Sequence, residues 1–284
     1  MSLHRFFLDE QIIAQEADEC FDLQLSAGDV KHFRVLRLRA GEHIAVIDAA
    51  RDYFECEITS TEGALPQVRI AVRGDAPVAR AQVILVQGLA KGDKFDEVIR
   101  HATELGVTGF VPLTCERSVV KLDAARAQKR VERWHSIARS AAMQAGREQI
   151  PSVEFPCDAA AAAQLLQHAT AVLVCWEEAP SDAVIDEAIA RALEEAPCAP
   201  TQACVALVVG PEGGLTHREV ETFLALERSA AITLGPSILR TETAGIVAPA
   251  LVLHELARLE RAHAACGEDT HTVSVEDTLK RVHP

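Results

Sequence analysis

The sequence predicts an α/β protein that is built on a parallel sheet and carries a small β-rich domain at its N-terminus. Three observations predict this fold class. Residues 1–73 hold short runs of strand character, residues 81–264 alternate apolar strands with helices, and Gly-Pro corners follow apolar runs within 207–214 and 232–245. Parallel strands end at one edge of an open α/β sheet, where ligands bind. The two corners therefore predict a small-molecule site.

The first 73 residues favour a small barrel. Three runs there have alternating or β-branched strand character, at residues 42–48, 53–59 and 67–72. Turn residues separate these runs, and this spacing is typical of a small barrel. A short helix that carries basic residues is expected over 29–37. Residues 74–80, which include Gly74 and Pro77, are expected to be a linker.

Residues 81–264 alternate between strands and helices, which indicates a parallel sheet. Four apolar runs are expected to be buried strands, at residues 82–87, 109–113, 171–175 and 204–209. Helices are expected at residues 93–105, 123–145, 159–163 and 182–195. Asp93 is a candidate N-cap, and Gly106 and Gly146 stand where the first two helices should end. Residues 265–284 are polar and non-periodic, and we expect a loose tail there.

The composition is typical of a protein outside the membrane. Of the 284 residues, 49% are hydrophobic and 25% are charged. No uncharged apolar run approaches the roughly 18 residues that cross a bilayer, and the N-terminus lacks the apolar stretch of a secretion signal. These features predict a cytoplasmic protein without a membrane partner. The eight cysteines are scattered, which predicts reduced thiols, and neither Cys nor His shows metal-ligand spacing, so no metal is expected.

The net charge of −14 argues against a nucleic-acid partner when it is taken alone. Its distribution weakens that argument, because residues 91–150 hold 11 Lys and Arg against 8 Asp and Glu. Basic side chains also gather within 32–39 and within 121–139. Local clusters of this kind keep an RNA partner open.

The first corner, Gly210-Pro-Glu-Gly-Gly214, joins an apolar strand to a helix. Glycines let the main chain approach a ligand closely, and Thr216 with Glu219 fits a capping box that starts a helix at about His217. A tight turn without a ligand explains the same residues equally well. No Gly-Lys-Ser/Thr follows the glycines, so this is not a phosphate-binding P-loop, and the pattern is not the Gly-x-Gly-x-x-Gly of dinucleotide sites.

The second corner is followed by Arg240, Thr241, Glu242 and Thr243 and then by a mostly apolar helix. One interpretation is structural: Thr241 or Thr243 caps the helix and Arg240 pairs with a carboxylate. The other is functional, since an arginine is always charged and offers a rigid fork of donors to an anionic or electron-rich substrate group.

The two corners resemble the cofactor-binding loops of the SPOUT class of S-adenosylmethionine-dependent RNA methyltransferases. More narrowly, the chain resembles the RsmE family, which methylates N3 of a uridine in 16S ribosomal RNA. The motifs that carry this resemblance lie in order along the chain, at residues 32–42, 91–94, 102–106, 116–118, 141–151 and the two corners. Two positions depart from the family pattern: Ser237 stands where an arginine is expected, and Met143 where an acidic residue is expected.

The resemblance implies a SPOUT-type parallel sheet with a C-terminal trefoil knot over residues 81–264, and a PUA-like β-barrel RNA-binding domain over residues 1–73. It also implies a homodimer with its site at the subunit interface. The apolar helix 245–256 is a candidate for part of that interface, and burial within its own subunit is the alternative. The implied partner is 16S ribosomal RNA within the small ribosomal subunit.

The resemblance also implies roles for named residues. S-adenosylmethionine is expected at Cys175, Trp176, Glu177, Val209, Gly210, Pro211, Glu212, Gly213, Leu234, Gly235, Ser237, Ile238, Leu239 and Thr243. RNA contacts are expected from Arg34, Arg37, Arg39, Lys91, Lys94, Arg117 and Arg147. Arg240 is expected to donate to a uracil oxygen and to stabilise developing negative charge, and Glu242 is a weaker candidate for the general base.

Other functions stay open at this point. Another SPOUT enzyme, such as a ribose 2′-O-methyltransferase, would share the same corners. A non-catalytic RNA-binding assembly factor could keep the fold, although Gly210, Gly213, Gly235 and Arg240 favour a working cofactor site. A nucleotide-binding protein that uses residues 210–214 for phosphate is disfavoured by the missing lysine.

Overall fold

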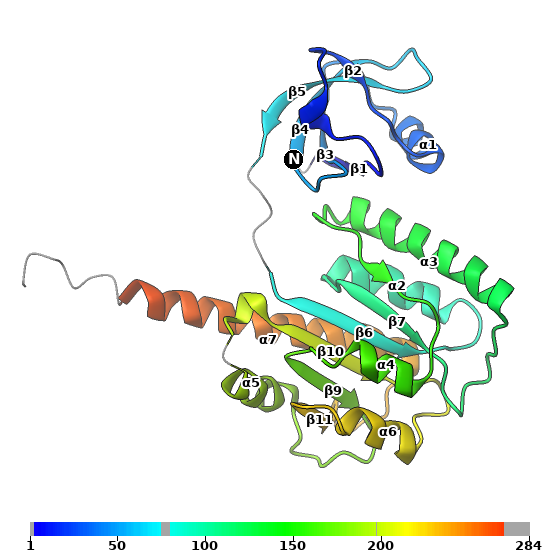
Figure 1. Ribbon diagram of the computed structural model, residues 1–284, viewed down its shortest axis with the longest axis vertical. Helices are drawn as coiled ribbons and strands as arrows, with labels where there is room; N and C mark the ends of the chain where they lie inside the picture. Colours follow the sequence, from blue (N-terminus) through cyan, green and yellow to red (C-terminus); the bar gives the residue numbers. More distant parts are fainter. Residues whose placement is uncertain (1–2, 75–79, 197, 270–284) are drawn as a thin grey trace, which may run out of the picture.

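The computed structural model describes residues 3–74, 80–196 and 198–269, and it contains two separate sheets (Figure 1). A five-stranded sheet precedes residue 75, and a six-stranded sheet follows residue 80. Every strand pair in the six-stranded sheet is parallel. The α/β class with a parallel sheet is therefore confirmed. Most of the expected linker 74–80 lies outside the described residues.

The N-terminal sheet has the strand order β1-β3-β4-β5-β2. Its strands are β1 (His4–Phe7), β2 (Phe21–Asp22), β3 (His43–Ile47), β4 (Tyr53–Ser60) and β5 (Gln67–Arg73). The last three match the expected runs, whereas β1 and β2 carried no alternation long enough to be recognised. In β4, every second side chain from Phe54 to Ile58 is buried, as a half-buried strand requires. Helix α1 (Ala27–Leu36) starts at Ser26, whose hydroxyl accepts from the Asp29 amide.

The C-terminal sheet has the strand order β11-β9-β10-β6-β7-β8. Its strands are β6 (Gln82–Gly88), β7 (Gly109–Leu113), β8 (Ser152–Val153), β9 (Ala171–Cys175), β10 (Cys204–Val209) and β11 (Ser229–Ile232). The helices are α2 (Lys94–Leu105), α3 (Ala124–Gln144), α4 (Ala159–Leu165), α5 (Ile185–Glu195), α6 (His217–Leu224) and α7 (Thr241–Asp269). Short 3-10 turns occur at η1 (Ile13–Gln15) and η2 (Pro200–Gln202).

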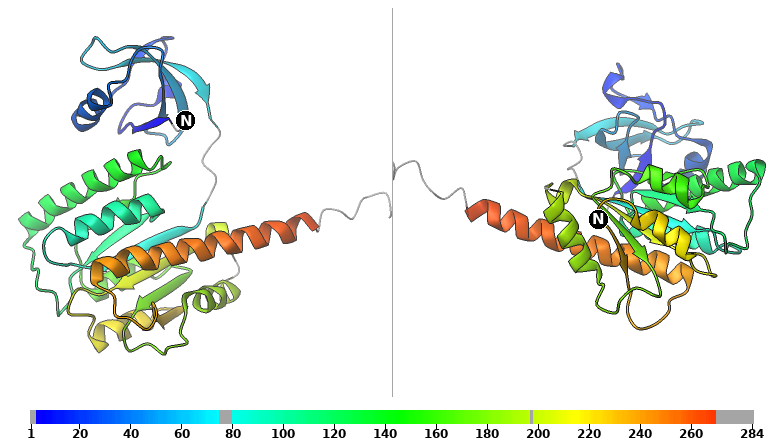
Figure 2. Two further views of the ribbon diagram at one scale, coloured as in Figure 1. Left: turned by 180° about the vertical axis from the view of Figure 1, so that it is seen from behind. Right: turned by 60° about the horizontal axis from the view of Figure 1, so that its bottom comes forward.

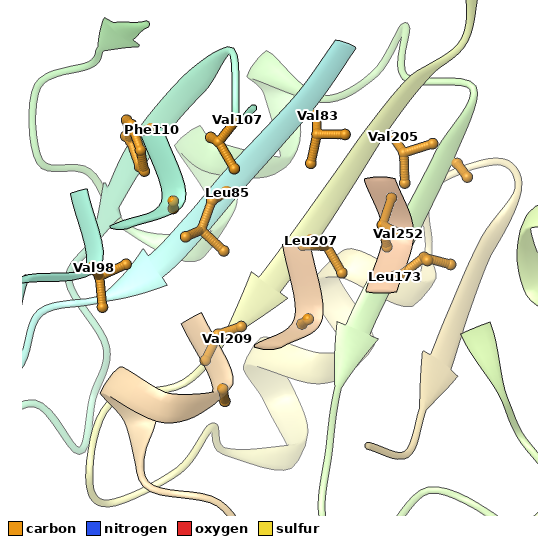
Figure 3. Packing of buried hydrophobic residues seen from close by; sticks show 14 of the residues in the cluster. Val83, Leu85, Val98, Val107, Phe110, Leu173, Val205, Leu207, Val209 and Val252 are labelled. Carbon is orange, nitrogen blue, oxygen red and sulfur yellow. The ribbon is translucent and has the colours of Figure 1, made fainter. Parts of the chain in front are cut away.

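Helices cover both faces of the parallel sheet (Figure 2). On one face, Val205, Leu207 and Val209 of β10 pack with Val252 of α7 and with residues of α2 and α5 (Figure 3). On the other face, alternate residues of β9 and β10 pack against α4 and α6. The central strands are therefore buried on both sides, which explains their continuous apolar sequences.

The C-terminal half of α3 joins the two sheets. Arg139 donates to the main-chain oxygen of Phe7 (2.6 Å) and to the carboxylates of Asp29 (2.7 Å) and Asp9 (2.7 Å). Met143 is buried in the core of the N-terminal sheet. The departure at Met143 thus falls at an apolar contact between the two parts of the chain, where a carboxylate would be costly to bury.

The helix ends correct two expectations and confirm a third. Asp93 stands at the N-cap of α2, but its side chain makes no capping hydrogen bond. Gly106, with φ of 130°, ends α2 as expected. The expected loose tail is wrong for residues 265–269, because α7 continues to Asp269 from residues 255–265, which are rich in good helix formers. Residues 270–284 lie outside the described residues. Across the described residues, no helix combines the length and the apolar character needed to cross a membrane.

Candidate functional site

Three neighbouring strands end together where the cleft opens. Cys175 at the end of β9 lies opposite Val209 of β10 on one side and Ile232 of β11 on the other. The two Gly-Pro corners therefore lie at the same sheet edge, as expected, but β9 separates their strands. The second run also leaves the sheet earlier than expected, because β11 ends at Ile232 and Leu234 lies in the loop.

The loops after these strands enclose a cleft of about 600 Å³, a volume within the usual range for small-molecule sites. Thirteen of the fourteen residues expected at the cofactor line it, and the exception is Thr243, which is exposed. The lining also includes residues that the sequence did not single out for this place, namely Lys94, Gly214, Leu215, Thr233, Pro236, Thr241 and Ala244. The resemblance included residues 91–94 but assigned Lys94 to RNA, whereas the structure places this side chain in the cleft lining.

Glycines bring the main chains of the site into close contact. A Cβ atom on Gly88, at the end of β6, would lie 2.3 Å from the nitrogen of Pro211. At Gly213, it would lie 3.0 Å from the Cβ of Arg117. Gly214 has φ of 71°, a conformation that side-chain-bearing residues rarely adopt. The glycines of the first corner are therefore required by close packing and, at Gly214, by the backbone conformation.

A buried hydrogen-bond chain ties β6, the first corner and α7 together. Gln87 donates from Nε2 to the hydroxyl of Thr241 (2.8 Å), and Thr241 donates to the main-chain oxygen of Gly210 (2.6 Å). A Cβ on Gly245 would lie 2.3 Å from Oε1 of Gln87. Thr241 is thus occupied in fixing the cleft wall and does not cap α7.

An ammonium group sits between two carboxylates beside the cleft. Lys94 Nζ lies 3.1 Å from Oε1 of Glu212 and 3.2 Å from Oε2 of Glu242. Hydrogen bonds that the ammonium group donates to these carboxylates raise the pKa of Lys94. Partial burial opposes ionisation of Glu212, but its own amide and Lys94 lower its pKa overall. The pKa of Glu242 is lowered by its own amide and, against some desolvation, by Lys94.

Arg240 lines the cleft and is exposed, so its guanidinium is accessible to a ligand. Among the ion pairs of the described residues, Glu242 pairs with Lys94 and none involves Arg240. The structural interpretation of the second corner, in which Arg240 pairs with a carboxylate, is therefore wrong for the described part of the chain. Nearby, Ile238 is 89% exposed on the same loop, and Ser237 lines the cleft beside it.

The basic residues expected to contact RNA fall into two groups. Arg34, Arg37 and Arg39 are exposed at α1 and just after it, and Lys91 is exposed before α2. Arg117 instead donates to the main-chain oxygens of Gly213 (3.3 Å) and Leu215 (3.2 Å).

Arg147 also hydrogen-bonds to main-chain oxygens of the protein itself. It donates to the main-chain oxygens of Thr103 (3.0 Å) and Val107 at the end of α2. Burial lowers the pKa of Arg147 to about 10. Arg117 and Arg147 therefore hold backbone in place, whatever else they contact.

Metal binding finds no support in the side-chain geometry. Across the part of the chain that the structure describes, no group of three or more His, Cys, Asp and Glu side chains is arranged to hold a metal ion. The seven cysteines with described side chains are unpaired, and they range from buried Cys56 and Cys115 to exposed Cys20.

Comparison with known proteins identifies the family of this chain. A model of the RNA methyltransferase domain matches residues 77–253. The ribosomal RNA small subunit methyltransferase E of Bacillus subtilis is 33% identical over 259 residues, which cover 89% of this chain and 97% of that protein.

Two solved structures agree with this match. A ribosomal RNA small subunit methyltransferase E from Neisseria gonorrhoeae, bound to S-adenosyl methionine, is 28% identical with a TM-score of 0.69. A putative methyltransferase from Legionella pneumophila, in complex with the same cofactor, is 25% identical with a TM-score of 0.71. Each alignment covers 89% of this chain and 97% of the other. The chain therefore belongs to the ribosomal RNA small subunit methyltransferase E family of RNA methyltransferases.

Proposed function

We propose that this protein transfers the methyl group of S-adenosylmethionine to N3 of one uridine in 16S ribosomal RNA, within the small ribosomal subunit. S-adenosylmethionine-dependent methylation of ribosomal RNA follows from its family. The uridine N3 target rests on the motif resemblance. The observation that carries the proposal is the cleft at the aligned ends of β9, β10 and β11, with the exposed Arg240 in its lining.

The residues of the cleft fit the cofactor. The volume of about 600 Å³ suits a ligand of this size, and the glycines at 210 and 213 let the first corner pack closely against Leu215 and Arg117 while it lines the cleft. Val209, Leu234 and Leu239 supply apolar walls. When bound, S-adenosylmethionine supplies an electrophilic methyl group on a sulfonium centre. The same cleft residues would hold it, with Thr241 and Ala244 in the place expected for Thr243.

Arg240 is assigned to the substrate base. The protein must hold the uracil ring in line with the methyl donor, and such positioning contributes several kcal/mol to catalysis. It must also stabilise the negative charge that develops on the ring as N3 loses its proton. A guanidinium that donates to a uracil oxygen would do this, and Arg240 is the exposed guanidinium in the cleft lining.

Glu242 is better suited to pairing than to proton abstraction. Its pKa is lowered, and a carboxylate that holds its negative charge firmly is a poor base for a weakly acidic N–H group. Its 3.2 Å contact with Lys94 gives it a different task, which is to anchor the start of α7.

The N-terminal sheet is proposed to be a PUA-like barrel over residues 1–73 that holds RNA through Arg34, Arg37 and Arg39. Residues 81–264 form the proposed methyltransferase domain, with the loops after β9, β10 and β11 in a trefoil knot. A homodimer is proposed as the active form. Leu251, on the outer side of α7, is 44% exposed and is a candidate for the dimer contact, whereas Ala248, Val252 and Leu256 of the same helix are buried within the subunit.

The reaction can be tested with purified protein. Tritiated S-adenosylmethionine is supplied together with either small ribosomal subunits or protein-free 16S RNA, both from cells that lack the enzyme. The proposal predicts stoichiometric label in N3-methyluridine, with the subunit as the better substrate. Label on a ribose 2′-oxygen would support the rival SPOUT activity, and cofactor binding without transfer to either RNA would support an assembly factor.

A further inference from the structure

Lys94 connects three segments that are distant in sequence. It lies in the first turn of α2, while Glu212 lies in the loop between β10 and α6, and Glu242 lies in the first turn of α7. The ammonium group reaches both carboxylates, at 3.1 Å and 3.2 Å. The main-chain amide of Lys91 adds a second bond to Glu212 (3.2 Å). The start of α2 therefore contacts both the first corner and the start of α7.

The contact lies at the rim of the cleft, where the bond from Lys94 to Glu212 is exposed and Glu242 is the most covered of the three groups. The side chains of Lys94, Glu212 and Glu242 are 32%, 33% and 19% exposed. The pair of Lys94 with Glu242 is therefore screened less by water and salt than the exposed pair with Glu212. Arg240 also acts on Glu242 electrostatically. Of these groups, Lys94 alone contacts both carboxylates.

We propose that Lys94 is a positioning residue, which fixes the methyl-donor cleft by clamping Glu212 of the first corner and Glu242 at the start of α7. This inference rests on the proposed function, because it takes the loops 210–215 and 233–240 to be the cofactor-binding loops. Lys94 acts on them through the two carboxylates, and it does so before any RNA is bound. Its position in the cleft lining gives this basic residue a task separate from contact with RNA phosphates.

Replacing Lys94 with an uncharged residue would remove the positive charge that lies between the two carboxylates at the cleft rim. Two carboxylates that now approach one nitrogen would face each other without a cation between them, and like charges at such distances repel. The first corner and the start of α7 would then separate. Cofactor binding would then require the first corner and the start of α7 to come together against this repulsion, so the affinity for the cofactor would fall.

The test compares Lys94→Met, which keeps the length of the side chain but removes the charge, with Lys94→Arg, which keeps the charge. Arg100→Met is the matched control, because Arg100 is an exposed cation on the same helix. Calorimetry with S-adenosylmethionine should show Kd rising about tenfold or more in Lys94→Met, since a half-buried carboxylate left unpaired is unfavourable. Lys94→Arg and Arg100→Met should stay within about threefold of the wild type.

Two further measurements separate positioning from general damage. As pH falls from 8 to 5.5, the ratio of the Lys94→Met Kd to the wild-type Kd should fall, because protonation of Glu212 or Glu242 relieves their repulsion. Adding Glu242→Gln to Lys94→Met should restore part of the lost affinity at pH 8, because residues in one network are not additive. Equal ratios at both pH values, with no recovery in the double variant, would overturn the clamp.

Hydrogen exchange measured without cofactor tests the clamp independently of the proposed function. The amides of residues 210–215 should exchange faster in Lys94→Met than in Arg100→Met. If the wild-type protein failed to bind S-adenosylmethionine, the proposed function would fall while the exchange result still tested the clamp. Unchanged exchange together with wild-type affinity in Lys94→Met would refute the inference and leave the proposed function intact.

Discussion

The hydroxyl of Thr241 donates a 2.6 Å hydrogen bond to the main-chain oxygen of Gly210, which fixes the start of α7 against the first corner of the cleft. The same hydroxyl accepts from Gln87, a residue of β6 that is 1% exposed. The Thr241 side chain thus connects β6 to the first corner and holds the wall of the cleft in place.

Thr241→Val should therefore destabilise the protein. The substitution keeps the shape of the side chain but leaves the Gln87 amide without an acceptor, which costs about 2 kcal/mol in the free energy of unfolding. Urea denaturation measures this value. Thr243→Val, two residues along with an exposed side chain, should change it by less than about 0.5 kcal/mol. Equal effects at the two positions would contradict the buried hydrogen-bond chain.

Gly88→Ala should be damaging for a steric reason. The added Cβ would lie 2.3 Å from the nitrogen of Pro211 and would push the first corner away from β6. Overpacking against backbone of this kind costs about 3 kcal/mol of stability. Gly28→Ala is the control, because its Cβ would meet its nearest neighbour at 3.8 Å inside α1 and should stabilise that helix by about 0.5 kcal/mol. Thermal unfolding of both variants should show shifts of opposite sign.

Arg139→Met should loosen the connection between the two sheets. It leaves Asp29, which is 5% exposed, without its cationic partner, and breaking such a buried pair costs about 3 kcal/mol or more. Arg126→Met lies on the same helix but removes an exposed pair with Asp123, which should contribute less than about 1 kcal/mol. Chemical denaturation of the two variants would contradict this account if it ranked them in the opposite order.

Cys175 should resist alkylation although it lines the cleft. Burial raises the pKa of its thiol to about 12, so the reactive thiolate is scarce at pH 8. Iodoacetamide followed by mass spectrometry should modify exposed Cys20 well before Cys175 in the folded protein. In urea the two should react at similar rates. Rapid labelling of Cys175 in the native protein would mean that the end of β9 is open to solvent.

Local signals in the sequence were sufficient for much of the fold. The capping box of Thr216 and Glu219, the apolar strands β6 and β10, and the end of α2 at Gly106 were all predicted, because each depends on residues close together in the chain. The Gly-Pro corners likewise predicted a shared sheet edge. The short strands β1 and β2 were not predicted, because their strand conformation depends on pairing with β3 and β5 and not on a pattern in their own sequences.

The missed features depend on contacts between distant residues. Lys94 and Glu242 are separated by 148 positions yet lie 3.2 Å apart, and no pattern in either segment indicates the pair. Arg117 and Arg147 carry the charge of RNA-binding residues, but in the folded chain they bond to backbone oxygens. Met143 departs from the family pattern without an evident reason in the sequence, and the core of the N-terminal sheet around it explains why an apolar residue is suitable there.

The most direct test of the central claim is mass spectrometry of 16S ribosomal RNA from cells with the gene, without it, and with the Arg240→Ala variant in its place. The account predicts that one N3-methyluridine disappears on deletion, returns with the wild-type gene and stays reduced with Arg240→Ala. The account would be contradicted if every N3-methyluridine persisted after deletion, or if the missing methyl group were on a ribose.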